Sequence, residues 1–223
     1  MRRSKRLFDL FWSALGLLLL FPVFLGIALA IKFDDGGPVF FRQRRIGYRG
    51  RPFAMWKFRT MVVDAEQKGG LLTVGRDPRV TRVGYWLRKT KLDELPQLWN
   101  VLKGEMSLVG PRPEVPQYVA LYTEEQRRVL ELVPGITDPA SIRFRHENEL
   151  LAQSPDPERT YVEVVMPEKI RLNLEYARRA TVWSDFAVIL QTFLALLRPS
   201  NAGEIGQSGS SAGPPDDRRS NLG

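Results

Sequence analysis

Apolar positions along the chain begin with one long hydrophobic segment, residues 7–33, which reads LFDLFWSALGLLLLFPVFLGIALAIKF. The segment is about as long as a helix that crosses a bilayer. Pro22 lies near its middle. Because proline lacks a backbone N–H and clashes with the preceding helical turn, the pattern predicts a helix that bends near Pro22.

The charges around this segment restrict how it can meet a membrane. Basic residues flank it on both sides: Arg2, Arg3, Lys5 and Arg6 precede it, and Arg42, Arg44, Arg45, Arg49 and Arg51 follow it. Since positively charged flanks tend to stay on the cytoplasmic side, both ends should lie on the same face of the membrane. A re-entrant hairpin that enters, bends at Pro22 and returns satisfies this requirement.

Two alternatives stay open for the segment. It could be a straight spanning helix, or it could be a cleaved signal peptide, which the Ala28-Leu29-Ala30 pattern favours. Against the second, the apolar run is longer than the usual core of a signal peptide. In either uncleaved form Asp9 would lie near the entry point, where Lys5 or Arg6 could pair with it.

The pattern after the hydrophobic segment predicts two strands and then helices. Residues 38–47 and 51–61 interleave aromatic and apolar residues with cations, as the strands of a hairpin do. A helical spacing of apolar residues resumes at Tyr85, and Pro96 fits the first turn of a helix. A further helix is expected within residues 114–133. This mixture predicts an α+β fold.

The C-terminal part of the chain is expected to hold two helices and a tail. Residues 167–179 carry both charge signs and form the first helix. Residues 183–198 begin with Ser184 as a natural N-cap and present a broad apolar face, which favours an interfacial helix over a core helix. Residues 199–223 are rich in Ser, Gly, Pro and Asp without periodicity, which is typical of a disordered tail.

Composition narrows the chemistry. The 223 residues include 33 Lys or Arg, 25 Asp or Glu, one histidine, His146, and no cysteine, for a net charge of +8. Disulfide frameworks, thiolate metal sites and histidine-rich metal clusters are therefore excluded. Catalysis is expected to depend on carboxylates, Arg, Lys or a bound hard cation. The excess of positive charge fits a partner that carries phosphates: a nucleic acid, an anionic membrane surface or a nucleotide.

An acidic pair interrupts this basic chain. Asp93 and Glu94 have Arg88 before them and Arg112 after them. Inside a helix neighbouring side chains diverge, but at a helix start just ahead of Pro96 both carboxylates can reach one spot. The nearby cations are expected to lower the pKa of both carboxylates and to bind an arriving phosphate. The alternative is that the pair only complements the positive helix N-terminus.

A carboxylate that faces a diphosphate has two productive uses. It can coordinate a Mg²⁺ ion that bridges the phosphates, or it can attack phosphorus and form an acyl phosphate. Asp93 and Glu94 supply one residue for each use.

Five stretches of the chain carry a family resemblance. In order, they read KRLFDLFWS, GGPVFFRQRRIG, FAMWKFRTM, DPRVTRVGYWLRKTKLDELPQLWNVLKGEMSLVGPRPE and VPGIT. They resemble the bacterial sugar transferase family, the monotopic phosphoglycosyl transferases that start polysaccharide and glycoconjugate assembly. The resemblance covers residues 5–137 and continues more weakly to about residue 197. The chain is similar to the compact members, which consist of the catalytic domain alone.

The resemblance implies a two-step, ping-pong reaction. Asp93 would attack the β-phosphate of a UDP-sugar, expel UMP and hold the phosphosugar as a covalent aspartyl intermediate. A polyprenol phosphate such as undecaprenyl phosphate would then take up the phosphosugar. Glu94, together with Asp93, would hold Mg²⁺ and orient the phosphates, which suits a transfer whose barrier is largely electrostatic. The family's re-entrant membrane helix is also broken by a proline, as expected here at Pro22.

The resemblance also implies binding residues. Arg88 matches the family position that grips a phosphate, and Pro111, Arg112 and Pro113 match the motif associated with the nucleotide. Lys57 and Arg59 are expected to be active-site or head-group cations, with solvated charges at a strand edge as the alternative.

The chain departs from the better-known larger members after Gly135. Those members continue with a Gly-Leu-Ala-Gln type of sequence, whereas this chain reads ITDPASIRFRHENELL. Contacts from this region are therefore not carried over. Arg143, Arg145 and His146 could line the site, but a single histidine there is expected to be structural and stays outside the catalytic set.

The expected organisation has three parts: a membrane-anchoring hairpin at residues 1–35, a catalytic domain with interfacial helices at residues 36–198, and the tail at residues 199–223. The catalytic domain would lie on the cytoplasmic face of the bacterial inner membrane. Its expected partners are a UDP-sugar, a polyprenol phosphate and membrane lipids, without nucleic acid. The oligomeric state, a homodimer included, stays open, as do the sugar and the polysaccharide pathway.

Two functions without catalysis are the alternatives. One is a membrane-anchored basic protein that binds nucleic acid, and the other is a scaffold in which Asp93 and Glu94 act as a helix cap. The sequence contains no recognised nucleic-acid-binding motif, and the acidic pair would repel a phosphate backbone unless a metal intervened.

Overall fold

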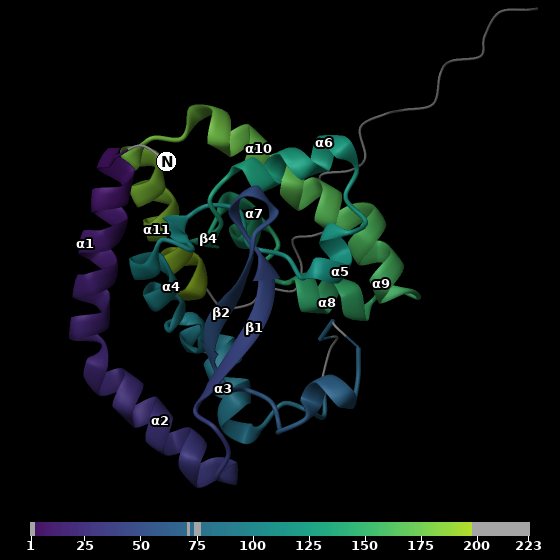
Figure 1. Cartoon of the computed structure of the whole chain (residues 1–223). Helices are drawn as coiled ribbons and strands as arrows, with labels where there is room; N and C mark the ends of the chain where they lie inside the picture. The colour runs from purple at the N-terminus through teal and green to yellow at the C-terminus, as the bar shows by residue number, and fades with distance from the viewer. Residues whose placement is uncertain (1–2, 71, 74–76, 198–223) are drawn as a thin grey trace, which may run out of the picture.

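Helices surround two small sheets in the computed structural model of the protein, which describes residues 3–70, 72–73 and 77–197 (Figure 1). The helices are α1 (Arg3–Leu19), α2 (Phe21–Asp35), α3 (Arg82–Thr90), α4 (Gln97–Lys103), α5 (Pro116–Val119), α6 (Glu124–Arg127), α7 (Pro139–Arg143), α8 (Glu147–Ala152), α9 (Pro157–Thr160), α10 (Met166–Arg179) and α11 (Val182–Leu197). The strands are β1 (Phe40–Ile46), β2 (Pro52–Phe58), β3 (Ser107–Val109) and β4 (Gly135–Thr137). Helices and strands mix as the α+β class predicts.

The N-terminal hydrophobic segment forms two helices along one side of the molecule (Figure 1). α1 ends at Leu19, α2 begins at Phe21 with Pro22 in its first turn, and the two helices are bent by 58°. The predicted bend near Pro22 is therefore confirmed. Within the described part of the chain no single helix is long and apolar enough to cross a membrane, and only this bent pair reaches that length together. The re-entrant course stays a prediction.

α1 is tied to the rest of the fold by buried polar contacts. The carboxylate of Asp9 is fully buried and accepts hydrogen bonds from the Ser107 hydroxyl (2.8 Å) and from a backbone N–H of β3 (3.2 Å). Lys5 and Arg6, the expected partners of Asp9, have other partners in the structure. Lys5 forms an ion pair with Asp185 of α11, and Arg6 donates to backbone carbonyls of α4. Asp9 finds its donors on β3 because a buried carboxylate needs hydrogen bonds.

The predicted strand pair is confirmed. β1 and β2 form an antiparallel hairpin in which Phe40 pairs with Phe58 and Ile46 pairs with Pro52. Two buried residues of β2, which point to opposite faces of the hairpin, belong to two apolar clusters. Met55 packs with residues of α4, β3 and α11, and Phe58 packs with residues of α2 and α3. The hairpin thereby joins both N-terminal helices to the interior.

β3 and β4 are parallel and bring two distant segments together. Their backbones approach so closely that a Cβ atom at Gly135 would lie 2.1 Å from the backbone nitrogen of Gly110. Glycine is therefore required at the crossing. The backbone N–H of Gly135 donates to the carbonyl of Pro111 at 2.9 Å. The contact fixes the segment that begins at Pro111 directly after β3.

The acidic pair does not lie in a continuous helix. α3 is followed by Lys91, which has a left-handed φ of 58°, and then by a single 3₁₀ turn, Leu92–Glu94. Pro96 directly precedes α4 as its N-cap residue. Asp93 and Glu94 therefore lie in a tight turn between two helices, one turn ahead of a helix start.

The C-terminal half packs around an apolar cluster that includes Val119, Leu151 and Met166. Residues 114–133 contain helix as predicted, but it is divided into α5, α6 and a 3₁₀ turn. A capping box at Thr123 starts α6 and separates it from α5. α10 agrees closely with the predicted helix.

α11 begins with a different cap from the predicted one. The hydroxyl of Thr181 accepts a hydrogen bond from the Ser184 backbone N–H (3.1 Å), and the Ser184 hydroxyl accepts one from the Thr181 backbone N–H (2.8 Å). Thr181 is thus the N-cap, and the assignment to Ser184 is wrong by three positions within a reciprocal capping arrangement. The predicted tail, residues 199–223, lies outside the described residues.

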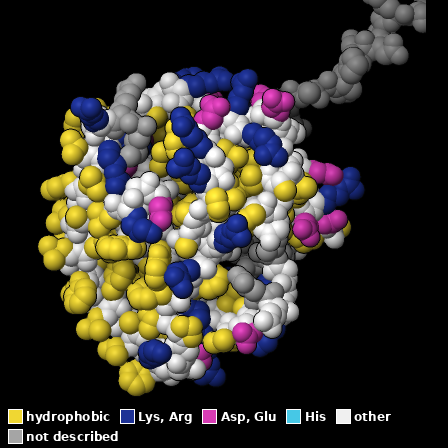
Figure 2. Space-filling view, in the orientation of Figure 1, with side chains coloured by type: hydrophobic (Ala, Val, Ile, Leu, Met, Phe, Trp, Pro, Cys, Tyr) yellow, Lys and Arg dark blue, Asp and Glu magenta, His cyan; other side chains and the backbone are white. Residues whose placement is uncertain are grey.

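Apolar side chains gather on one part of the surface. In Figure 2 they cover the edge that α1 and α2 form, while Lys and Arg side chains spread over the centre of the same view. Residues of α11 are exposed as well, with Trp183 84% and Phe193 61% exposed. Contiguous exposed apolar surface typically marks a contact with a membrane or another protein.

Candidate active site

Asp93 and Glu94 lie in the turn between α3 and α4, and each has a different environment. Asp93 is buried, and its oxygen Oδ1 has no hydrogen-bond partner among the residues that the structure describes. Glu94, in contrast, is held by two cationic side chains. It accepts two hydrogen bonds from the Arg112 guanidinium, at 2.8 and 2.5 Å, and its Oε1 lies 3.6 Å from Nζ of Lys57.

The electrostatic consequence differs between the two carboxyls. Burial alone would raise the pKa of Glu94, but Arg112 and Lys57 outweigh burial and hold this pKa well below its usual range. The pKa of Asp93 is raised, by burial and then by the charge of Glu94, which Lys57 and the other cations offset only in part. The prediction that cations lower both pKa values is therefore wrong for Asp93. The charge pattern of the sequence indicated the cations but not the burial.

Lys57 projects from β2 toward the acidic pair. Burial lowers its pKa to about 8, although Glu94 favours the charged form. The structure thus brings Lys57 to the site, as predicted.

Arg88 approaches the same turn from α3. Its guanidinium donates to the hydroxyls of Thr60 (2.8 Å) and Thr73 (3.2 Å). Burial lowers the pKa of Arg88, and the charge of Asp93 is the largest effect that opposes this shift. Thr60 and Thr73 are absent from the predicted site, because no local pattern links them to Arg88.

Arg59 does not join the acidic pair. Its guanidinium forms an ion pair with Asp35 at the end of α2 and donates to the carbonyls of Pro38 (2.6 Å) and Met61 (2.9 Å). Its donors are thereby used to tie α2 to β2. We correct the prediction for this residue: Arg59 holds the fold and lies outside the candidate site.

Pro111 and Pro113 contribute through their backbone. Pro111 accepts a hydrogen bond from Gly135, and Pro113 accepts one from Arg45 at 3.0 Å. With both flanking carbonyls held and both φ angles fixed by the proline rings, Arg112 has little freedom to leave Glu94. The two prolines therefore position Arg112.

A large groove of about 2070 Å³ adjoins the site. Arg88, Glu94 and Arg112 line its polar part. Apolar side chains of α1 and α11 line another part: Phe8, Trp12, Leu15, Leu19, Phe186, Ile189, Leu190 and Phe193. Arg145 and His146 line the groove too, and Arg145 donates to His146 at 2.8 Å. The groove, with one polar part and one apolar part, therefore matches a ligand that carries a phosphate on a long apolar chain.

A divalent cation would find few protein ligands here. Among the described residues no group of three or more His, Cys, Asp or Glu side chains could hold a metal ion. Mg²⁺, however, commonly binds one or two carboxylates together with substrate phosphates and water. The unpartnered Oδ1 of Asp93 is suited to such a role, whereas both oxygens of Glu94 already face cations. The residues fit a cation that arrives with a diphosphate.

Comparison with known proteins gives the family. A family model described as bacterial sugar transferase matches residues 1–199. The UDP-glucose:undecaprenyl-phosphate glucose-1-phosphate transferase of Escherichia coli (strain K12) is 40% identical over 199 residues, which are 86% of this chain and 39% of that protein. Galactosyl transferase CpsE of Streptococcus agalactiae serotype III (strain NEM316) is 36% identical over 210 residues, 89% of this chain and 43% of that protein.

A shorter relative is matched over most of its length. Exopolysaccharide production protein ExoY of Rhizobium meliloti (strain 1021) is 35% identical over 208 residues, 86% of this chain and 85% of that protein. The chain spans about two fifths of the length of the other two relatives. With the family model matched over residues 1–199, the chain belongs to the bacterial sugar transferase family.

Proposed function

We propose that the protein is a phosphoglycosyl transferase that moves a sugar 1-phosphate from a UDP-sugar to undecaprenyl phosphate and releases UMP. The product would start the assembly of an exopolysaccharide, O-antigen, capsule or other glycoconjugate. The observation that carries the proposal is the contrast within the acidic pair: Asp93 has a buried oxygen that finds no partner in the described part of the chain, while Arg112 and Lys57 hold Glu94. The name of the Escherichia coli relative gives the same reaction class for that protein.

The chemistry runs through Asp93 in two steps. A carboxylate oxygen of Asp93 attacks the β-phosphorus of the donor, and a new oxygen–phosphorus bond forms. The bond from this phosphorus to the bridging oxygen breaks, and UMP leaves with that oxygen and the bonding electrons. A phosphate oxygen of undecaprenyl phosphate then attacks the same phosphorus and displaces the carboxylate, which yields undecaprenyl diphosphate sugar.

The surrounding side chains assist by charge and position. Asp93 must be ionised to attack. Because the residue is buried, its ionised carboxylate is poorly solvated and therefore reactive. Arg88 and Lys57 supply positive charge where negative charge develops on the phosphoryl oxygens. Arg112 donates to Glu94 and also lines the groove, where an arriving phosphate could share its donors.

Of the predicted pair, Asp93 is the residue that would hold Mg²⁺ together with the donor diphosphate, because both oxygens of Glu94 already face Arg112 and Lys57. When bound, the ion neutralises phosphate charge and favours departure of UMP.

The apolar part of the groove suits the prenyl chain of the acceptor. Side chains of α1 and α11 line it, and both helices also present apolar residues at the surface. This supports a location of the site at the membrane surface, with the re-entrant hairpin as anchor and the catalytic part on the cytoplasmic face. A charged, water-soluble donor and a lipid-linked acceptor can meet only at such a boundary.

The test is a donor-only reaction followed by mass spectrometry. Purified protein is incubated with each of a panel of UDP-sugars and Mg²⁺, without acceptor, and UMP release and intact mass are measured. We expect one equivalent of UMP and an added phosphosugar on the peptide that contains Asp93. Asp93→Asn should lose both signals, and UMP release with acceptor should fall by at least about 10³-fold.

Asp64→Asn is the matched control, because Asp64 is exposed and lies outside the groove. It should keep the adduct and the rate. Sustained UMP release by Asp93→Asn, or rapid wild-type turnover without any adduct, would rule out the aspartyl intermediate.

A further inference from the structure

Lys91 is a cation next to the acidic pair that has no role in the reaction as proposed. Lys57 and Arg112 contact Glu94. Arg88 donates to two hydroxyls. The Lys91 side chain, in contrast, is exposed and forms no hydrogen bond or ion pair with the part of the chain that the structure describes. Its ammonium group is therefore available to a ligand.

The backbone of Lys91 has a conformation that favours glycine. The residue ends α3 in the left-handed region, with φ 58° and ψ 15°. Its N–H donates to the carbonyl of Arg88 at 3.3 Å, and its carbonyl accepts from the N–H of Glu94 at 3.2 Å, so the turn is held on both sides. Glycine is the usual residue at such a helix end. Since strained backbone positions cluster at functional sites, a lysine here indicates a role for its side chain.

The charge of Lys91 reaches the reacting carboxylate. Burial and then the charge of Glu94 raise the pKa of Asp93, and Lys91 is one of the cations whose charge opposes this shift. Charges act on each other over several ångströms in a poorly solvated site. An anion that arrives next to Asp93 would therefore be attracted by Lys91 as well.

Lys91 also begins an apolar wall of the active-site groove. Leu95 and Leu98 follow it at intervals of four and three residues, and all three residues line the groove. This spacing is typical of side chains on one helical face. Leu98 in turn reaches α1, since its Cδ1 atom would lie 3.2 Å from a Cβ atom at Gly16, another residue of the groove. The groove thus offers a cation followed by an apolar wall that leads to the N-terminal helix.

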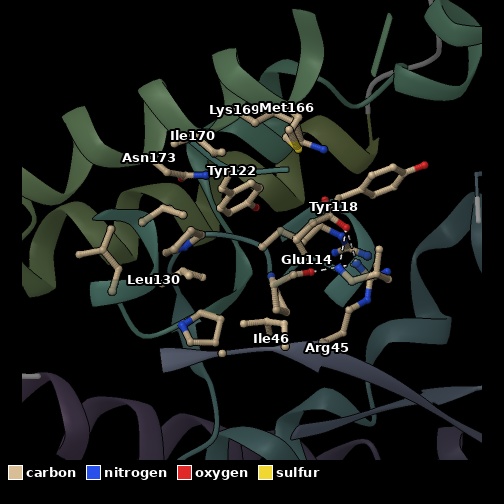
Figure 3. Close-up of a pocket in the computed structure, with 18 of the residues that line it drawn as sticks. Arg45, Ile46, Glu114, Tyr118, Tyr122, Leu130, Met166, Lys169, Ile170 and Asn173 are labelled. Atoms are coloured by element: carbon tan, nitrogen blue, oxygen red, sulfur yellow. Dashed lines mark hydrogen bonds and ion pairs between the residues drawn. The ribbon is translucent and has the colours of Figure 1, made fainter. Parts of the chain in front are cut away.

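A second, smaller cavity next to Arg112 cannot take a lipid-linked ligand. Its volume is about 150 Å³, and Figure 3 shows Ile170 and Asn173 of α10 on one side of it and Arg45 and Ile46 of β1 on the opposite side. A cavity of this size holds a molecule about as large as benzene. Arg112 lines both spaces, so an acceptor with a long prenyl chain has to approach the acidic pair through the groove.

The second half of the proposed reaction requires positive charge at this place. The acceptor phosphate carries about 1.5 to 2 negative charges near neutral pH. It has to approach a phosphoryl group that is itself anionic, and Arg112 and Lys57 are already occupied by Glu94. A lysine ammonium is a compact charge with three donors on a flexible stem, so it can follow a phosphate as the phosphate moves toward Asp93.

We propose that Lys91 receives the phosphate of the acceptor and that Leu95 and Leu98 contact the first part of its prenyl chain. The proposal rests on the proposed function, because it takes the acceptor to be a polyprenol phosphate that attacks a phosphosugar held on Asp93. Lys91 acts in the second half-reaction, and the first half-reaction does not need it.

The experiment separates the two half-reactions by steady-state kinetics in neutral detergent micelles. kcat/KM is measured for the UDP-sugar and for undecaprenyl phosphate, each at a saturating concentration of the other, because in a ping-pong reaction each constant reports its own half-reaction. Lys91→Gln and Lys91→Gly both remove the charge. Each should lower kcat/KM for the acceptor about tenfold and leave kcat/KM for the donor unchanged. Lys91→Arg keeps the charge and should stay near wild type.

Two variants serve as controls. Glycine adopts a positive φ without strain, so Lys91→Gly should unfold at a temperature no lower than that of wild type. A loss of acceptor use in this variant then reports on the side chain and not on the fold. Lys68→Gln is the matched control for charge, since Lys68 is exposed and lies outside the groove and the smaller cavity. It should leave both constants unchanged.

Three results would overturn the proposal. The first is a wild-type kcat/KM for the acceptor in Lys91→Gln. The second is an equal loss of kcat/KM for the donor, which would assign Lys91 to the UDP-sugar. The third is a loss that appears only in vesicles with anionic lipid and not in neutral micelles, which would make Lys91 a general contact with lipid head groups. Wild-type protein that releases no UMP from any donor would overturn the proposed function itself.

Discussion

Two adjacent carboxylates in this protein have opposite surroundings. Arg112 and Lys57 hold Glu94 ionised, whereas burial raises the pKa of Asp93, whose Oδ1 has no partner among the residues that the structure describes. Environments that push two pKa values apart commonly separate the roles of paired catalytic acids. This separation supports the proposal that Asp93 carries the reacting atom and that Glu94 has an electrostatic role.

The pH dependence of the reaction should show both effects. Activity should rise with pH through the raised pKa of Asp93, because the carboxylate must be ionised to attack. Activity should fall again as the pH rises through about 8, where Lys57 loses its proton. Lys57→Arg stays charged and should move only the alkaline limb to higher pH. A kcat/KM profile from pH 5 to 10 measures this, and an alkaline limb unchanged in the variant would exclude Lys57 as its source.

Two of the three arginines predicted for the site, Arg112 and Arg59, should respond differently to the same substitution. Arg112→Lys loses the paired hydrogen bonds to Glu94, so kcat/KM should fall about 10²-fold. Arg59→Lys breaks a fold contact with Asp35 and should lower the free energy of unfolding by about 1–3 kcal/mol while kcat/KM stays near wild type. Measurements of UMP release and of thermal unfolding distinguish the two variants. Equal losses of kcat/KM in both would show that Arg59 belongs to the active site.

Residues of the site could be predicted from the sequence where their chemistry is local. Asp93, Glu94 and Arg88 lie within one short motif, and the structure brings Lys57 and Arg112 to them. The role of Arg59 could not be predicted, because its partner Asp35 lies at the end of a different element. The raised pKa of Asp93 depends on burial, which a charge pattern does not indicate.

At the scale of elements, close packing decides where the site residues lie. The strand hairpin and the bend near Pro22 follow from local patterns, and both are confirmed. The short helices between residues 114 and 133 and the left-handed residue Lys91 depend on caps and tertiary contacts, so helical spacing alone predicted longer helices. The parallel pairing of β3 with β4 has no local signal at all.

Gly84 tests the packing of α3. A Cβ atom there would lie 2.1 Å from the carbonyl oxygen of Thr60, so the helix rests directly on the segment after β2. Gly84→Ala should displace α3 and lower the free energy of unfolding by about 1–3 kcal/mol. It should also weaken the hydrogen bond that the Thr60 hydroxyl accepts from Arg88, so kcat/KM should fall as well. Gly70→Ala is the control, because nothing lies within 4 Å of a Cβ atom at that position. Equal stability of the two variants would contradict this packing argument.

At the scale of the whole molecule, the apolar edge formed by α1 and α2 and the exposed face of α11 are the surfaces that we propose meet lipid. The location and the re-entrant course are proposals that rest on this surface, on the flanking cations and on the bend of 58°. Basic residues near an anionic surface would strengthen the contact by about 1 kcal/mol each.

The membrane topology can be tested by labelling introduced cysteines. The chain contains no cysteine of its own, so no background labelling is expected. Ser4→Cys and Arg42→Cys place single thiols before and after the hydrophobic segment. In sealed vesicles of known orientation, a membrane-impermeant maleimide should label both thiols from the same side, since a re-entrant hairpin returns to its starting face. Labelling from opposite sides would show a spanning helix and eliminate the hairpin.

The short strand β3 has a practical consequence for anyone who wants a detergent-free enzyme. Asp9 of α1 binds this strand, and the strand leads within a few residues to Arg112. Truncation before β1 would leave the Ser107 hydroxyl and an apolar cluster facing water and would loosen the connection on which the catalytic arginine depends. The shortened protein should therefore lose its active site along with its anchor, and solubilisation is better sought by redesigning the outward faces of α1 and α2.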